Sequence, residues 1–355
     1  MRTFGRELAP LYEYRPVDAG SQMRLIPARV QAKVSSRMTH HRQVYMVLTP
    51  RSLSYARDAL ESLFRNSLEV LRVHLITDSE KDKRELSEAV SSLDAKVHEW
   101  QVYSEKDVAD REEDLFKGHR NLRAFRKGHP CWRKITDPLL LSDPGAELLL
   151  LDPDVYFPNR FRFEETPKSG LLLMWQRPNC LFPPEVVRTA IGFGIRLADH
   201  VDIGVAHWRA SADLDWLDWL VGSLGGTSLP HIMHIEAIVW SALAMRSGGG
   251  HLDPDHWKCW HRSTTRRVMT RIGVSGSRIL RSEPWADLKC FHAGGHAKFW
   301  LHAAREEGML DGRSELSGPG LTIPFVELTP AHFARERALK YVLGALGYYR
   351  IFRAA

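Results

Sequence analysis

Residues 147–157 read E-L-L-L-L-D-P-D-V-Y-F, and this stretch decides how the rest of the chain is arranged. Four consecutive leucines predict a strand that is buried on both faces, as in a parallel sheet covered by helices. Asp152 and Asp154 follow at its carboxyl end, and two buried carboxylates so close together are costly unless a cation neutralises them. A divalent ion that prefers oxygen ligands is such a cation. Pro153 and the aspartates also suit a surface turn, so the acidic pair alone leaves both interpretations open.

The chain before the acidic pair alternates between predicted strands and predicted amphipathic helices. Strand patterns cover residues 44–49, 71–77 and 96–102. The helical segments between them carry apolar stripes, and Ser79 caps the second one. This order predicts a three-layer α/β/α fold around a central, mostly parallel sheet. Ligands of such sheets bind at the carboxyl ends of the strands, which is where Thr49, Asp78 and Asp152 stand.

The second half of the chain mixes strands, predicted over residues 170–175 and 200–208, with helices, predicted over residues 214–224 and 234–245. Near its end, Gly294 and Gly295 permit a ligand to approach the backbone closely. His292 offers a metal-binding nitrogen and Lys298 a phosphate-binding ammonium group. An ordinary glycine turn with a core histidine is the alternative for this segment. Together with the acidic pair, however, these residue types are what a metal-bound diphosphate requires.

Composition limits the classes of protein to consider. The chain has 355 residues, of which 44% are hydrophobic, and a net charge of +6, which favours a globular protein with an anionic partner. No stretch has the composition of a signal peptide or the length of a membrane span, so a cytoplasmic protein is expected. The cysteines form no C-x-x-C pair, so neither a structural zinc site nor a disulfide framework is expected. They are Cys131, Cys180, Cys259 and Cys290.

The chain divides into three predicted regions. They are an N-terminal extension over residues 1–42, a domain over 43–310 with a nucleotide-binding half at 43–157 and an acceptor half at 158–310, and a tail over 311–355. The tail carries an amphipathic helix that is apolar, aromatic and basic, which suits peripheral contact with the inner face of a membrane. The alternative is a last helix docked on the domain through Leu339, Val342 and Leu346. Residues 120–127 are either a solvated helix or a basic surface for a phosphate-bearing ligand.

Two motifs resemble those of the retaining glycosyltransferases of family 8, the glycogenin and lipopolysaccharide galactosyltransferase group with the GT-A fold. The D-x-D motif of that family is similar to Asp152-Pro153-Asp154. Its C-terminal signature H-x-x-G-x-x-K-P-W is similar to His292, Gly295, Lys298 and Trp300, with Phe299 in place of the proline. The resemblance covers roughly residues 44–300 and is strongest at these two motifs.

Weaker matches to the same family implicate further residues. Y-A-R-D-A-L from Tyr55 resembles a Y-A-x-x-A-L motif whose tyrosine stacks on uracil, although a helix residue that packs on the sheet explains Tyr55 as well. Lys134 falls where these enzymes carry a lysine that reaches the donor. D-I-G at Asp202 is similar to the N-x-G strand of the family, and the helix with Glu236 resembles its D-Q-x-x-x-N helix. Two positions of that helix depart from the motif, Ile235 and Trp240.

The resemblance implies a hexosyltransferase that uses a nucleotide-sugar, most often a UDP-hexose such as UDP-glucose or UDP-galactose, and retains the anomeric configuration. The implied roles are metal binding for Asp152, Asp154 and His292, diphosphate binding for Lys298 with Gly294 and Gly295, and base stacking for Tyr55. This set of two oxygens and one nitrogen suits Mn²⁺ better than Mg²⁺. Asp202 and Glu236 would orient sugar hydroxyls and stabilise positive charge on the donor ring.

Other functions fit the sequence less well. A sugar-phosphate nucleotidyltransferase also uses a D-x-D metal site, but it carries a glycine-rich loop where this chain has T-P-R-S-L-S after the first strand. A phosphatase of the haloacid dehalogenase type needs D-x-D-x-T early in the chain, which is not the pattern here. The basic residues are scattered rather than arranged in one stripe with aromatic residues, so no nucleic-acid partner is expected. The acceptor hydroxyl could belong to a saccharide, a protein or a small molecule.

Overall fold

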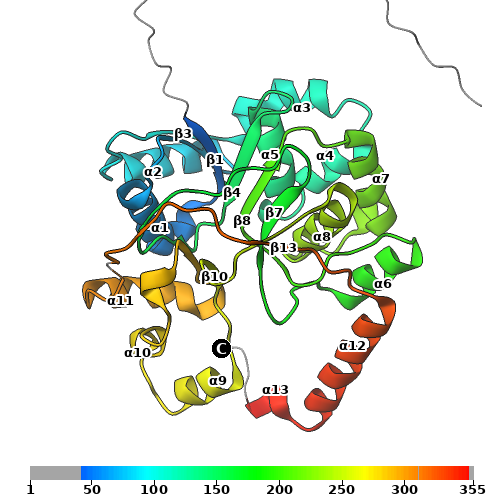
Figure 1. Cartoon of the computed structure of the whole chain (residues 1–355). Helices are drawn as coiled ribbons and strands as arrows, with labels where there is room; N and C mark the ends of the chain where they lie inside the picture. Colours follow the sequence, from blue (N-terminus) through cyan, green and yellow to red (C-terminus); the bar gives the residue numbers. More distant parts are fainter. Residues whose placement is uncertain (1–40, 311, 352–355) are drawn as a thin grey trace, which may run out of the picture. The chain divides into compact units, whose positions relative to one another are not determined.

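The structure is a computed structural model that describes residues 41–310 and 312–351, and His40–Ala355 form one compact unit. The predicted N-terminal extension lies outside the described residues except for its last two positions. The unit is a mixed α/β structure in which helices cover both faces of one central sheet (Figure 1). This arrangement confirms the predicted fold class.

The first half of the unit forms the parallel part of the sheet, in the order β3-β2-β1-β4. Its strands are β1 (Arg42–Val47), β2 (Leu71–Ile76), β3 (Glu99–Tyr103) and β4 (Glu147–Leu151). Helices between them include α1 (Leu53–Asn66), α2 (Glu80–Ser91) and α5 (Arg133–Leu141). Ser79 caps α2, because its side chain accepts a hydrogen bond from the amide of Asp82. The parallel pairing brings the carboxyl ends of all four strands to one edge of the sheet.

The second half extends the sheet with strands of both directions. Its main strands are β5 (Val155–Tyr156), β7 (Leu171–Trp175), β8 (Val201–Arg209), β10 (Trp257–Cys259) and β11 (Cys290–His292). β8 runs antiparallel to both β4 and β7, while β10 runs parallel to β7 and β11. β11 also pairs antiparallel with β5, and the amide of Ala293 donates to the carbonyl of Asp154 at 2.9 Å. This last pairing places the histidine segment beside the acidic pair.

The leucines of β4 connect the two helical layers. Leu148 and Leu150 belong to one apolar cluster, which also contains residues of α5, and Leu149 and Leu151 belong to a second cluster with residues of α1 and α2. Two further helices of the first cluster are α7 (Leu214–Leu224) and α8 (Ile235–Ser247). All four leucines are fully buried, and each contributes roughly 1.5–3 kcal/mol to folding through that burial. The strand is therefore firmly held before the acidic pair begins.

The basic segment 120–127 is helical and partly exposed. It forms α4 (Arg120–Arg126) with the following Lys127. The guanidinium of Arg126 is buried and forms ion pairs with Glu112 and, at 2.8 Å, with Asp137. This buried cation holds neighbouring helices together and is not available to a phosphate, whereas Arg120 and Lys127 are exposed. Phosphate binding by this segment stays a prediction.

The expected docking of the last helix is wrong. That helix, α12 (Pro330–Ala345), contacts the core through Phe333, which is 8% exposed. Leu339, Val342 and Leu346 are 59%, 50% and 75% exposed, so they do not form a buried stripe. α12 extends away from the sheet in Figure 1 and leads to α13 (Tyr348–Ile351) beside α9 (Thr264–Arg271). These three side chains are exposed, and no described element buries them.

A buried neutral histidine makes the fold sensitive to acid. His207 on β8 is fully buried beside Phe163 and Trp257, and this burial, with a smaller effect of Arg42, lowers its pKa to about 3. In the unfolded chain the ring titrates near pH ~6.5. Between these two values the unfolded state binds the additional proton, so stability is lost as the pH falls.

We expect His207→Leu to weaken this dependence of stability on pH. Between pH ~7 and ~5 the variant should lose about 2 kcal/mol less unfolding free energy than the unmodified chain. Urea unfolding at the two pH values measures the difference, and comparing the change with pH, not the stability itself, removes the effect of altered packing. Equal losses in the two proteins would contradict the prediction.

Candidate functional site

The carboxyl ends of the strands surround a cavity of about 1040 Å³. Every residue predicted for the site lines it: Thr49, Tyr55, Asp78, Lys134, Asp152, Asp154, Asp202, Glu236, His292, Gly294, Gly295 and Lys298. These residues come from widely separated parts of the chain, which the sheet brings to a single edge. The cavity is therefore the candidate active site.

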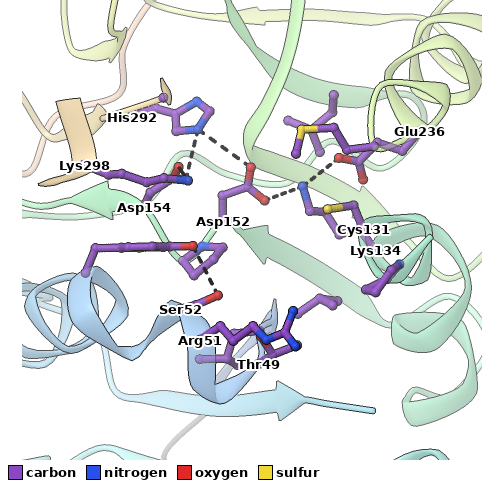
Figure 2. A pocket seen from close by; sticks show the side chains of 18 of the residues that line it. Thr49, Arg51, Ser52, Cys131, Lys134, Asp152, Asp154, Glu236, His292 and Lys298 are labelled. Atoms are coloured by element: carbon purple, nitrogen blue, oxygen red, sulfur yellow. Dashed lines mark hydrogen bonds and ion pairs between the residues drawn. The ribbon is translucent and has the colours of Figure 1, made fainter. Parts of the chain in front are cut away.

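Asp152, Asp154 and His292 face one another at the end of β4 (Figure 2). Nε2 of His292 lies 3.2 Å from Oδ1 of Asp154 and 3.7 Å from Oδ2 of Asp152. One ligand atom from each residue lies within 4.8 Å of the others. Two carboxylates and an imidazole at this spacing fit a divalent ion such as Mn²⁺.

The charges of this group are strongly coupled. Burial would lower the pKa of His292, but Asp202 and Asp154 together raise it well above its usual range. Burial would raise the pKa of Asp154, but His292 and Lys298 lower it to about 2. Burial raises the pKa of Asp152, although Lys134 opposes this effect. Asp154 is therefore the carboxylate of the group that stays ionised most readily.

Asp202 holds the other nitrogen of the same imidazole. Its Oδ1 lies 2.7 Å from Nδ1 of His292 and accepts a second hydrogen bond from the amide of Gly204 at 2.8 Å. An irregularity in the pairing of β7 with β8 occurs at this point of β8. A Cβ atom at Gly204 would lie 2.5 Å from Nδ1 of His292, so only glycine leaves room for the ring. An Nδ1–H bond to Asp202 leaves Nε2 as the ligand atom that faces Asp152 and Asp154.

Lys134 lies between two carboxyl groups on the other side of Asp152. Its Nζ is 2.5 Å from Oδ1 of Asp152 and 2.8 Å from Oε1 of Glu236 (Figure 2). Burial raises the pKa of Glu236 to about 8 despite the opposing effect of Lys134. Oε2 of Glu236 is buried and has no hydrogen-bond partner among the described residues. The raised pKa lets this carboxyl group take up a proton near neutral pH, and in that form its Oε2 can donate a hydrogen bond to a ligand.

Lys298 and Tyr55 form a second wall of the cavity. Nζ of Lys298 lies 3.4 Å from Oδ2 of Asp154 and 4.6 Å from the centre of the Tyr55 ring. The ring also contacts Phe299 edge to face, with 5.9 Å between ring centres. Tyr55 therefore stands at the cavity wall rather than against the sheet, and Phe299, which replaces the proline of the resembling signature, is its neighbour. Gly295 has φ +66°, a conformation that favours glycine.

Several lining residues were not singled out by the sequence. Arg51 lies directly after β1, in the 3-10 turn Pro50–Ser52, and its side chain is exposed at the cavity. Arg51 could have been predicted as a site residue, because it follows a parallel strand at its carboxyl end. Cys131 and Cys180 also line the cavity, and burial raises the pKa of each thiol to about 12, which excludes a thiolate nucleophile at pH 7. Asp78, by contrast, is held by an ion pair of 2.9 Å with Arg133.

No protein-family model matches the chain, and no curated protein sequence matches it significantly. Among solved structures, mouse xyloside xylosyltransferase 1 in its apo form is 14% identical with a TM-score of 0.45, over 71% of this chain and 97% of that one. The galactosyltransferase LgtC in complex with donor and acceptor sugar analogs is 13% identical with a TM-score of 0.41, over 76% and 95%. Core-mannan synthase A from Aspergillus fumigatus, in its Mn/GDP form, is 10% identical with a TM-score of 0.35, over 59% and 70%. These are distant similarities, so the chemistry of this chain has to be judged from its own residues.

Lys134 should be essential for the stability of the site. Lys134→Met removes the cation between two buried carboxyl groups, and we expect a loss of about 3 kcal/mol of unfolding free energy. Adding Glu236→Gln should lessen that loss, because one carboxyl group fewer is left without its partner. Urea unfolding at pH ~7 in EDTA measures both effects. The exposed Lys127→Met is the control, with an expected change within about 0.5 kcal/mol, and strictly additive losses for Lys134 and Glu236 would contradict the coupling.

Proposed function

We propose that this protein is a metal-dependent glycosyltransferase that moves a hexose from a nucleotide-sugar, UDP-glucose or UDP-galactose, to an acceptor hydroxyl with retention of configuration. The observation that carries the proposal is the group of Asp152, Asp154 and His292 with Lys298 beside it, in a cavity of about 1040 Å³. Transfer breaks the bond between the anomeric carbon of the sugar and an oxygen of the diphosphate, and a divalent cation together with a further positive charge stabilises the diphosphate as it leaves. This group of residues offers both.

On the donor side, Asp152, Asp154 and His292 would hold Mn²⁺, which neutralises the charge that develops on the leaving diphosphate. The ammonium group of Lys298 would bind a phosphate oxygen, in exchange for its present contact with Asp154. The backbone turn at Gly294 and Gly295 has open space on its cavity side, where a phosphate could approach closely. Tyr55 would supply a flat surface for the base.

The carboxyl groups assigned to the sugar favour retention. Asp202 is engaged by His292 and the amide of Gly204, and Glu236 is held by the ammonium group of Lys134 at 2.8 Å. Both carboxyl groups thus have partners within the site, which favours a positioning role over that of the base that inversion requires. In a retaining reaction the leaving diphosphate can accept the proton of the acceptor hydroxyl from the same face. Glu236 would then hold a sugar hydroxyl with its unpaired Oε2, while Asp202 orients His292.

The exposed face of α12 fits peripheral contact with an anionic membrane. Leu339, Tyr341, Val342 and Leu346 are exposed apolar or aromatic residues, and the same helix carries Arg335, Arg337 and Lys340. Basic residues around an apolar face are complementary to anionic lipid headgroups. In the described part of the chain, no helix is both long enough and apolar enough to cross a bilayer.

Donor use should depend on the metal group. Release of UDP from UDP-hexoses should fall to background in each of the variants Asp152→Asn, Asp154→Asn and His292→Ala. The two ligands that remain in each variant bind the metal ion too weakly to keep it at the diphosphate. A panel of nucleotide-sugars, with Mn²⁺ or with excess chelator, measures this release, and Asp110→Asn on the exposed surface is the matched control. Undiminished turnover in chelator would sink the proposal. Release of pyrophosphate from a nucleoside triphosphate and a sugar phosphate would instead identify a nucleotidyltransferase.

The product should have the same anomeric configuration as the donor. Proton NMR of freshly formed product from an α-linked donor should show an α-linkage. Glu236→Gln keeps the hydrogen-bonding shape but removes the carboxyl proton, and we expect transfer to slow by roughly 10²-fold rather than stop. A β-linked product would overturn retention and make Glu236 or Asp202 the base.

The contact with membranes should require the last helix. The intact chain should float with vesicles that contain anionic phosphatidylserine, and a chain that ends before Ala338 should not. Leu339→Gln with Leu346→Gln removes apolar area but keeps every charge, so flotation of this variant should fall as well. Equal flotation of the intact and the shortened chain would rule out this surface.

A further inference from the structure

Three basic residues stand together at the ends of β7 and β10. Arg177 follows β7, and His261 and Arg262 follow β10; these three are called the rim group below. The two strands are parallel, with Trp175 opposite Lys258, so the residues that follow them emerge side by side. Arg177 and His261 are exposed, and Arg262 is half-buried.

The rim group lies next to the metal group but on the side away from the nucleotide-binding strands. The sheet order β1-β4-β8-β7-β10-β11 separates it from Thr49 and Tyr55, which follow β1. Gln176, adjacent to Arg177, lines the cavity. The amide of Trp260, adjacent to His261, donates to the carbonyl of His292 at 2.8 Å. A ligand that contacts the rim group would therefore reach the cavity beside Gln176 and Trp260.

The positive charge of the rim group is not neutralised by the protein. Within the described residues, neither guanidinium, of Arg177 or of Arg262, has a hydrogen-bond or ion-pair partner. The neighbouring carboxylate of Glu283 is buried and already shared by Lys258, at 3.0 Å, and Arg266. Burial lowers the pKa of His261, and the positive charges of Arg266 and Arg177 lower it further.

We propose that the rim group binds an anionic group, a phosphate or a carboxylate, on the acceptor. The inference rests on the proposed function, because it assigns the second substrate of the same cavity. Two guanidinium groups from adjacent strand ends can each form paired hydrogen bonds with the oxygens of such an anion. A neutral acceptor would form only uncharged hydrogen bonds with these two groups, which are weaker than those of an anion. The acceptor is thus a sugar phosphate, an acidic sugar or a similarly charged molecule.

Calorimetry with glucose 6-phosphate, glucuronate and glucose, in EDTA, tests this assignment. We expect at least one of the two anionic sugars to bind about tenfold more tightly than glucose, and which of the two does so identifies phosphate or carboxylate as the group. Arg177→Gln with Arg262→Gln should weaken that binding by about tenfold or more, as expected from the loss of charge-assisted hydrogen bonds. Arg188→Gln, an exposed arginine on α6 (Pro184–Gly192), is the matched control and should bind as the unmodified chain does.

Two results would overturn the assignment. One is equal or absent binding of all three sugars, and the other is a loss of binding in Lys298→Gln with no loss in the rim variant, which would place the anion at the diphosphate position. Release of UDP from the nucleotide-sugar without acceptor is measured in parallel and should be unchanged in the rim variant. Failure of the unmodified chain to bind UDP-glucose or UDP-galactose in the presence of Mn²⁺, with anion binding intact, would refute the proposed function but not the anion site.

Discussion

The site depends on the burial of carboxylates where β4 ends and β8 begins. Asp152, Asp154 and Asp202 are removed from water, and in the described structure their charge is balanced by Lys134, Lys298 and a protonated His292. A metal ion requires the neutral imidazole, so an ion that binds here displaces one proton and adds net positive charge to the cavity. Without a metal ion, the charges of the site nearly cancel. With the ion bound, the site has a net positive charge that attracts an anionic ligand.

The parallel half of the fold and its acidic pair could be predicted because their signals are local. Four leucines followed by D-P-D define a buried strand and its end, and alternating strands and helices fix the direction of the neighbours. The approach of His292 to this pair is a long-range event. It depends on the antiparallel pairing of two short strands, β5 and β11, whose sequences carry no periodicity long enough to detect. In the sequence, the histidine could be placed near the acidic pair only through its resemblance to a known motif.

Other features depend on contacts that no periodicity encodes. The irregularity in β8 turns Asp202 toward His292, so that its first partner is an imidazole rather than a sugar. The raised pKa of Glu236 follows from complete burial beside Asp152, which is a property of the assembled cavity. For α12, the spacing of the apolar residues indicated one face of a helix, but it could not indicate whether another element covers that face. Arg177 and Arg262 become a group only because β7 and β10 are neighbours in the sheet.

The pairing of β5 with β11 also has a consequence for biosynthesis. Lys298 and Asp154 are 144 residues apart, and His292 lies just before Lys298. A ribosome therefore exposes the two aspartates long before it has made the histidine and the lysine that complete their surroundings. During that interval the nascent chain has carboxylates but no imidazole, and hence no ion site of the finished composition. The metal group can therefore form only after β11 has been synthesised and has paired with β5.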